Sequence, residues 1–194
     1  MKADFIIRAA LQSDAVELKK LFQNTVLAIN RRDYSQAEVE DWASCGDDLS
    51  NIEDMIKTHY FIVAINQQSE IVGFSSITPQ GYLHSMFVHK DFQGEGIATM
   101  LLNEIEQYAI TNGIIRITSE VSLTARPFFE KKGYIVEEEQ KRKANQLSLT
   151  NSGWPNRRYV RKTYRIDKNQ IEVFRYYSLF LVTFRSDPYL KEKL

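Results

Sequence analysis

The chain has 194 residues, 43% of them hydrophobic, which is enough for one well-buried domain with an appendage and excludes a disordered chain. Basic and acidic side chains number 25 each, so the balanced charge argues against a whole-protein attraction to nucleic acid or anionic membranes. The single cysteine, Cys45, excludes an internal disulfide.

The N-terminal third predicts one short strand followed by helices. Residues 5–8 are typical of a strand, and polar N-cap residues ahead of an apolar repeat predict an amphipathic helix over residues 14–30. Ser35 and Glu38 have the spacing of a capping box, which predicts a second short helix after them. Residues 50–58 predict a further short helical segment.

The middle of the chain predicts a three-stranded antiparallel meander. Residues 60–65, 71–77 and 82–89 are rich in β-branched and aromatic side chains and are separated by polar or glycine-containing turns. The last of these strands leads through a turn with Gly94 and Gly96 into a helical pattern.

The remaining elements complete an α/β order. We expect a helix over residues 97–111, then a strand over 114–121 that lies beside the strand of residues 82–89 and is parallel to it, because a helix intervenes. A short helix over 128–132 follows. Residues 134–138 and 147–150 predict a closing hairpin.

The turn with Gly94 and Gly96 has a direct chemical meaning. The first N–H groups of a helix have no internal partners, and glycines let the backbone come close to a ligand, so this turn can seat a phosphate or pyrophosphate. A tight connection without a ligand is the alternative. The pattern is neither a P-loop nor a full dinucleotide fingerprint, because the further residues that those motifs need are missing.

Two blocks of the sequence resemble the GNAT superfamily of N-acetyltransferases. The segment Gln93-x-x-Gly96-x-Ala98 is similar to the loop that holds the pyrophosphate of acetyl-CoA in that family. Residues 122–134, with Phe128 and Phe129, resemble its second block. The resemblance covers about residues 4–150. It implies a mixed, mainly antiparallel central sheet flanked by helices, acetyl-CoA as co-substrate, no metal, and transfer of an acetyl group to a primary amine of a small molecule or a peptide.

The resemblance also implies which residues bind the cofactor. Backbone groups of one strand would pair with the pantetheine arm, amides of the turn would hold the pyrophosphate, and residues of the second block would line the path. These residues are, in chain order, Met86, Phe87, Val88, Gln93, Gly94, Glu95, Gly96, Ile97, Ala98, Ser122, Phe128 and Phe129. Phe129 is a departure, because many members carry there a tyrosine thought to protonate the leaving thiolate. Water, Tyr134 or Tyr82 would have to serve instead.

Candidates for the general base are His84 and Glu120, which lie on the two strands that flank the expected cofactor path. The ordinary pKa of histidine, about 6.5, suits such a base. A purely structural role is the alternative for each. No set of His, Cys, Asp and Glu residues has the spacing of a metal site.

The acceptor wall in the resembled family is formed by the region after the first helix. Tyr34, Glu38 and Trp42 are therefore candidate substrate-binding residues. The alternative is that Trp42 belongs to the core and that Glu38 only closes the helix cap.

The C-terminal segment differs in composition from the rest of the chain. Residues 151–194 contain ten Lys and Arg against four Asp and Glu, and the interruption near residue 153 predicts a boundary between a domain over 1–150 and an extension over 151–194. Its basic and aromatic residues would suit nucleic acid, but a solvated face of a strand or helix is favoured. The apolar part of the extension favours packing against the body or against a second copy in a homodimer.

Two functional hypotheses remain open from the sequence. The first is a cytoplasmic N-acetyltransferase, since Met1 is followed by no signal pattern and no segment is long and apolar enough to cross a bilayer. The second is a non-catalytic acyl-CoA-binding module whose C-terminal extension contacts a partner or nucleic acid.

Overall fold

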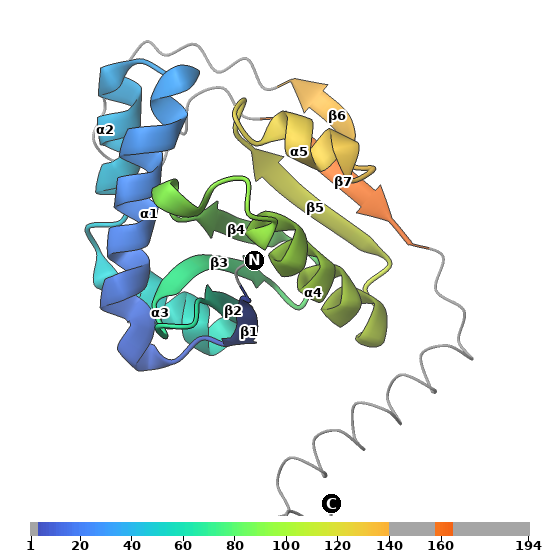
Figure 1. Cartoon of the computed structure of the whole chain (residues 1–194). Helices are drawn as coiled ribbons and strands as arrows, with labels where there is room; N and C mark the ends of the chain where they lie inside the picture. Colours follow the sequence, from blue (N-terminus) through green and yellow to red (C-terminus); the bar gives the residue numbers. More distant parts are fainter. Residues whose placement is uncertain (1–3, 140–157, 165–194) are drawn as a thin grey trace, which may run out of the picture.

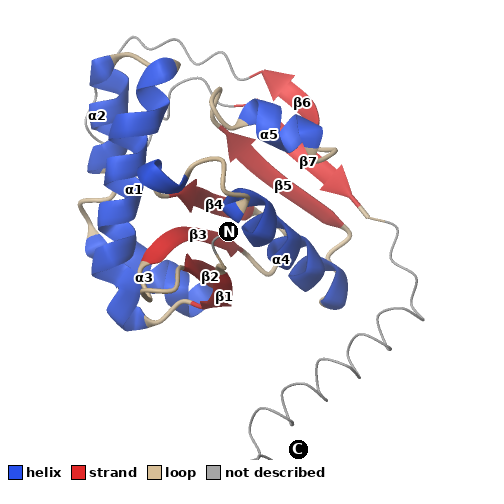
Figure 2. Cartoon of the chain, in the orientation of Figure 1, coloured by secondary structure: helices blue, strands red, loops and turns tan. Residues whose placement is uncertain are grey.

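The computed structural model describes residues 4–139 and 158–164, which form two β-sheets flanked by helices (Figure 1; Figure 2). The described helices are α1 (Ala15–Ile29), α2 (Gln36–Ser44), α3 (Leu49–Thr58), α4 (Ile97–Thr111) and α5 (Arg126–Lys131). The described strands are β1 (Ile6–Ala9), β2 (Tyr60–Ile65), β3 (Ile71–Ile77), β4 (Leu83–Val88), β5 (Arg116–Val121), β6 (Ile135–Glu139) and β7 (Arg158–Thr163). The predicted α/β class with a mainly antiparallel sheet is confirmed.

The first sheet is the predicted meander with one strand added. Its order is β1-β2-β3-β4, and every neighbouring pair is antiparallel. All seven residues of β3 are buried, because this strand is internal and helices cover both faces of the sheet.

The two faces of this sheet belong to different cores. Along β2, Ile62 and Ala64 pack in the core that α4 covers, whereas Phe61 and Val63 pack in the core that α1, α2 and α3 cover. This alternation follows from the two-residue period of a strand. Figure 1 shows α1 and α2 running together along one side of the molecule, apart from α4.

Gly73 in β3 sets the position of the start of α4. A Cβ atom at this residue would lie 2.9 Å from Cγ2 of Ile97 and 3.2 Å from Cδ1 of Leu101. The helix can therefore approach the sheet closely only because this residue has no side chain. The first turn of α4 is held against β3 and β4 as a result.

The second sheet corrects the predicted closing hairpin. Its order is β5-β7-β6, so the partner that the structure shows for β6 is β7, while the predicted strand over residues 147–150 lies outside the described residues. β7 lies beyond the boundary predicted at residue 150. Val160 is fully buried, and Nζ of Lys162 lies 2.9 Å from Oε1 of Glu106 on α4. Residues 158–163 of the basic segment thus form a strand of this sheet.

The described helices include none that is both long and apolar enough to span a membrane. The predicted role of the C-terminal extension in a homodimer concerns mainly residues 165–194. These lie outside the described residues, so that role stays a prediction.

Candidate active site

The two sheets meet at one point. The amide of Thr118 donates a 2.9 Å hydrogen bond to the carbonyl of Gly81, and Tyr82 forms an isolated parallel bridge with Thr118. This confirms the predicted parallel relation of the two strands at their beginnings. Beyond that point β4 and β5 belong to different sheets, and residues from both line one cavity.

One edge of β4 faces this cavity. The amide of His89 donates to the carbonyl of Val72 over 2.8 Å, and Phe87 stands opposite Phe74 in the antiparallel register. Because hydrogen-bonding direction alternates along a strand, the backbone groups of Phe87 belong to the ladder with β3, and those of Met86 and Val88 point to the cavity. The predicted backbone role is therefore wrong for Phe87, whose ring lines the cavity instead.

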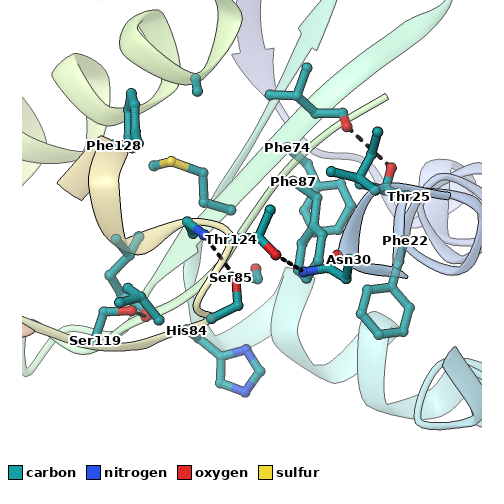
Figure 3. A pocket seen from close by; sticks show the side chains of 18 of the residues that line it. Phe22, Thr25, Asn30, Phe74, His84, Ser85, Phe87, Ser119, Thr124 and Phe128 are labelled. Atoms are coloured by element: carbon teal, nitrogen blue, oxygen red, sulfur yellow. Dashed lines mark hydrogen bonds between the residues drawn. The ribbon is translucent and has the colours of Figure 1, made fainter. Parts of the chain in front are cut away.

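The cavity has a volume of about 1320 Å³ and passes between the two sheets. At one end it is lined by the start of α4 and by α5, and at the other by α1, the end of α2 and α3. Figure 3 shows Phe128 on the first side and Phe22, Phe74 and Phe87 on the other, with Ser85 and His84 between the two groups. The space therefore suits two molecules that enter from different sides and meet near β4.

The glycine turn before α4 forms an open cradle. Gly94 and Gly96 have φ values of +83° and +87°, and a Cβ atom at either would find no other atom within 4 Å. From Gly94 to Ala98, no amide donates to another backbone group within the part of the chain that the structure describes. Free amides at the start of a helix of 15 residues attract an anion.

Gln93 ties this cradle to β4. Its Nε2 donates to the carbonyl of Val88 over 2.7 Å and to that of His89 over 3.3 Å. Thr25 of α1 also donates to the carbonyl of Val88, over 3.1 Å. The side chain of Gln93 thus positions the turn, and the carbonyl of Val88 already has two protein donors.

The segment between α1 and α2 is linked to the loop after β5. The hydroxyl of Tyr34 accepts a 2.8 Å hydrogen bond from the amide of Leu123, and the hydroxyl of Thr124 donates to Asp33 over 2.7 Å. Asn30 donates to the same hydroxyl over 3.3 Å (Figure 3). These contacts join the two walls of the cavity at its rim.

The predicted acceptor wall is partly corrected by these contacts. Trp42 lines the cavity, but Tyr34 is buried and its hydroxyl is occupied by Leu123. The carboxylate of Glu38 accepts from the amide and the hydroxyl of Ser35 at 2.8 and 2.7 Å. Glu38 is therefore a capping residue, as the alternative proposed, and it does not line the cavity.

The residues predicted to bind the cofactor line the cavity, with one exception. Glu95 is exposed and lies outside the lining, because it stands at the tip of the turn between the two glycines. The others are Met86, Phe87, Val88, Gln93, Gly94, Gly96, Ile97, Ala98, Ser122, Phe128 and Phe129. The structure thus gathers the two sequence blocks around one space.

Both predicted general bases also line the cavity. Glu120 lies on β5, and His84 lies on β4 where the register with β3 shifts. The ring of His84 is exposed and lies 5.5 Å from that of His59 and 6.0 Å from that of Tyr82. Burial lowers the pKa of His59, so this neighbour stays neutral at pH 7.

The two tyrosines named as replacement acids differ in position. Tyr82 lines the cavity, whereas Tyr134 is buried outside it, with its ring 5.1 Å from that of Phe129. Burial and the nearby Glu106 raise the pKa of Tyr134. Of the two, only Tyr82 lines the cavity, so Tyr82 is kept as the candidate acid.

Several lining residues were missed by the sequence analysis. They include Phe22 of α1, Met55 of α3 and Phe74 of β3, all of which have the spacing of ordinary core residues. No local signal separates a core position from one beside a cavity. In the described ranges no group of three or more His, Cys, Asp and Glu side chains could hold a metal ion.

Comparisons with known proteins agree with this arrangement. A family model described as an acetyltransferase (GNAT) domain matches residues 30–151. The uncharacterized N-acetyltransferase YafP of Escherichia coli K12 is 27% identical over 145 residues, which are 75% of this chain and 91% of that protein.

Solved structures share the fold. A GCN5-related N-acetyltransferase of Rhodopseudomonas palustris has a TM-score of 0.75 at 24% identity, and the match covers 84% of this chain and 98% of that one. The PaiA N-acetyltransferase of Thermoplasma acidophilum, solved in complex with coenzyme A, has a TM-score of 0.68 at 18% identity, covering 83% and 99%.

Proposed function

Because this chain belongs to the GNAT family of acetyltransferases, we propose that it transfers the acetyl group of acetyl-CoA to a primary amine by direct attack on the thioester. The proposal is carried by one observation: the glycine cradle and the open edge of β4 line the same cavity. The acceptor is a small molecule or an amine of a peptide, and the reaction takes place in the cytoplasm.

The cradle and the strand edge fit the two ends of a CoA molecule. The unpartnered amides from Gly94 to Ala98 would hold the pyrophosphate. Gly94 and Gly96 have no side chains, and this leaves space for the pyrophosphate. Backbone groups of Met86 and the amide of Val88 would pair with the pantetheine arm, since the carbonyl of Val88 is already occupied by Thr25 and Gln93. When bound, acetyl-CoA supplies the thioester carbon that the acceptor attacks.

The residues of the protein then have separate tasks. His84 accepts a proton from the acceptor ammonium, which leaves the neutral amine that can act as a nucleophile. The amine nitrogen forms a bond to the acetyl carbon and releases its second proton to water, while the carbon–sulfur bond breaks. Tyr82 or a water molecule gives a proton to the thiolate, because Phe129 has no hydroxyl to donate. Positioning both substrates supplies much of the acceleration, of the order of 7–11 kcal/mol.

The proposal is tested by measuring thiol release from acetyl-CoA with a panel of primary amines and by identifying the acetylated amine by mass spectrometry. Release that depends on the amine is expected. CoA binding without release above background for any amine would contradict turnover and would favour the non-catalytic acyl-CoA-binding module.

An Ala98→Pro variant tests the pyrophosphate seat. Proline is tolerated in the first turn of a helix but has no N–H group, so one donor is removed while α4 is kept. Since a hydrogen bond to a charged group is worth about 1.5–3 kcal/mol, we expect the Kd of CoA to rise about tenfold or more. Titration calorimetry measures this change.

Gln36→Pro provides the matched control. Gln36 is the first residue of α2 and does not line the cavity, so the Kd of CoA should stay unchanged in this variant. Equal Kd values of CoA for the wild type and for a folded Ala98→Pro protein would show that the pyrophosphate does not bind at this turn.

A further inference from the structure

The end of the cavity away from α4 has an apolar wall. Five aromatic rings line it, and they come from α1, α2, β2, β3 and β4. They are Phe22, Trp42, Phe61, Phe74 and Phe87. Phe87 contacts three of the others, with ring centroids 5.0 Å from Phe22, 5.3 Å from Phe74 and 6.4 Å from Trp42. Aliphatic side chains of α1 and α3, among them Ile52 and Met55, complete this wall.

The charges around the cavity are few and uneven. The only cationic side chain among the described lining residues is Lys131 of α5, at the end where α4 starts. Asp54 and Glu120 are the only acidic ones among them, and Asp54 forms a 3.2 Å ion pair with Lys57. Among the described residues at the acceptor end, a carboxylate or phosphate on the acceptor would therefore meet no cation, and a polyamine would lack the several carboxylates that it needs.

We propose that the acceptor is an aralkyl primary amine, with its aromatic body against the rings of Phe22, Phe74 and Phe87 and its amino group near His84. This inference rests on the proposed function. Apolar walls favour an aromatic body by removing its surface from water, and aromatic pairs add an edge-to-face contribution. The same walls disfavour the charged form of the amine, which helps to produce the neutral nucleophile.

The chemistry of the step is balanced within this arrangement. The ammonium proton passes to His84, the neutral amine nitrogen forms the bond to the acetyl carbon and gives up a second proton to water, and the sulfur leaves as a thiolate that takes up one proton from Tyr82 or water. No oxidant, reductant or further reactant is needed.

Gly46 preserves the shape of this wall. A Cβ atom at Gly46 would lie 2.8 Å from Cδ1 and 3.0 Å from Cε1 of the Phe22 ring. The ring can occupy its position only because residue 46 has no side chain. The shape of the wall thus depends on the contact between residue 46 and the Phe22 ring, which lies away from the cofactor end of the cavity.

The test compares 2-phenylethylamine with ethanolamine phosphate and spermidine in the thiol-release assay. We expect kcat/KM for 2-phenylethylamine to exceed the other two values by at least about tenfold, the scale of discrimination by an apolar pocket. A preference for ethanolamine phosphate or spermidine would overturn the inference and leave acetyl transfer itself intact.

A Met55→Arg variant places a cation in the apolar wall. We expect kcat/KM for 2-phenylethylamine to fall at least about tenfold, while the Kd of CoA stays within about twofold. Glu53→Arg adds a cation on α3 outside the lining and should keep the activity. If Met55→Arg fails to fold, Asn51→Arg takes its place, because Asn51 is exposed and lines the cavity.

Calorimetry of 2-phenylethylamine binding in the presence of CoA, which carries no acetyl group, distinguishes a failure of the aralkyl-amine inference from a failure of the proposed acetyl transfer. Binding that is weakened by Met55→Arg supports the aromatic site even if no amine is turned over, and in that case only the proposed function fails. Turnover of 2-phenylethylamine that is unchanged in Met55→Arg would overturn the inference that the acceptor is an aralkyl amine.

Discussion

A His84→Gln variant is expected to lose about 100-fold in kcat, because a positioned general base contributes a factor of this order or more. The CoA affinity should not change, since the glycine cradle and the open edge of β4 are left intact. Steady-state kinetics at saturating acetyl-CoA, with the Kd of CoA from calorimetry, measure both quantities. Glu120→Gln tests the competing base under the same conditions.

The pH profile adds a readout that a structural role would not move. A base works only when it is neutral, so wild-type kcat/KM should fall on the acidic limb of the pH profile, where the base is protonated. The His84→Gln variant should lose this limb. His89→Gln, outside the cavity lining, is the control and should keep both the rate and the limb. A wild-type limb that survives in His84→Gln would transfer the role to another group.

A Gly81→Ala variant is expected to lose about 3 kcal/mol or more of the free energy of unfolding. The new Cβ would lie 2.3 Å from the carbonyl oxygen of Arg116 and 2.7 Å from Cγ2 of Ile114, and Gly81 has a φ of +90°. The clash falls where the two sheets meet, so no shift of a flexible side chain can relieve it. Urea unfolding measures the loss.

Gly113→Ala is the matched control for this prediction. Gly113 also has a positive φ, +73°, but a Cβ atom there meets nothing within 4 Å. Only the backbone strain of about 1–2 kcal/mol remains. Equal losses in the two variants would show that the contact with Arg116 carries no weight.

The parts of the fold that the sequence predicted are those with local signals. The β2, β3 and β4 strands alternate or are continuously apolar between clear turns, and α4 starts at a glycine turn and ends at Asn112. β7 was missed because its pairing with β5 is distant in sequence and because, among residues 160–163, whose burial is described, Val160 is the one that is fully buried. Pairing over such a distance leaves no trace in a short window.

The residues of the candidate site were likewise predictable only where the sequence carries a local signal. The residues of the glycine turn have a spacing that carries chemical meaning, and all but Glu95 line the cavity. Tyr34 and Glu38 were assigned to the acceptor wall, yet their polar atoms are occupied by Leu123 and Ser35. Phe22 and Met55 line the cavity, but only the tertiary structure distinguishes such apolar residues from the core. The acceptor end was therefore the least predictable part.

The hydrogen bond from Thr118 to Gly81 lies where the two sheets of the molecule meet. A β-sheet is ordinarily stiff because many rungs connect neighbouring strands, but here, among the described residues, the backbone rungs between the two sheets lie at Gly81 and Tyr82, with one further bond from the hydroxyl of Ser119 to the carbonyl of Leu83. A molecule bound along β4 as proposed would supply the rungs that are missing there, so the ligand itself would become part of the scaffold that holds the two sheets in register.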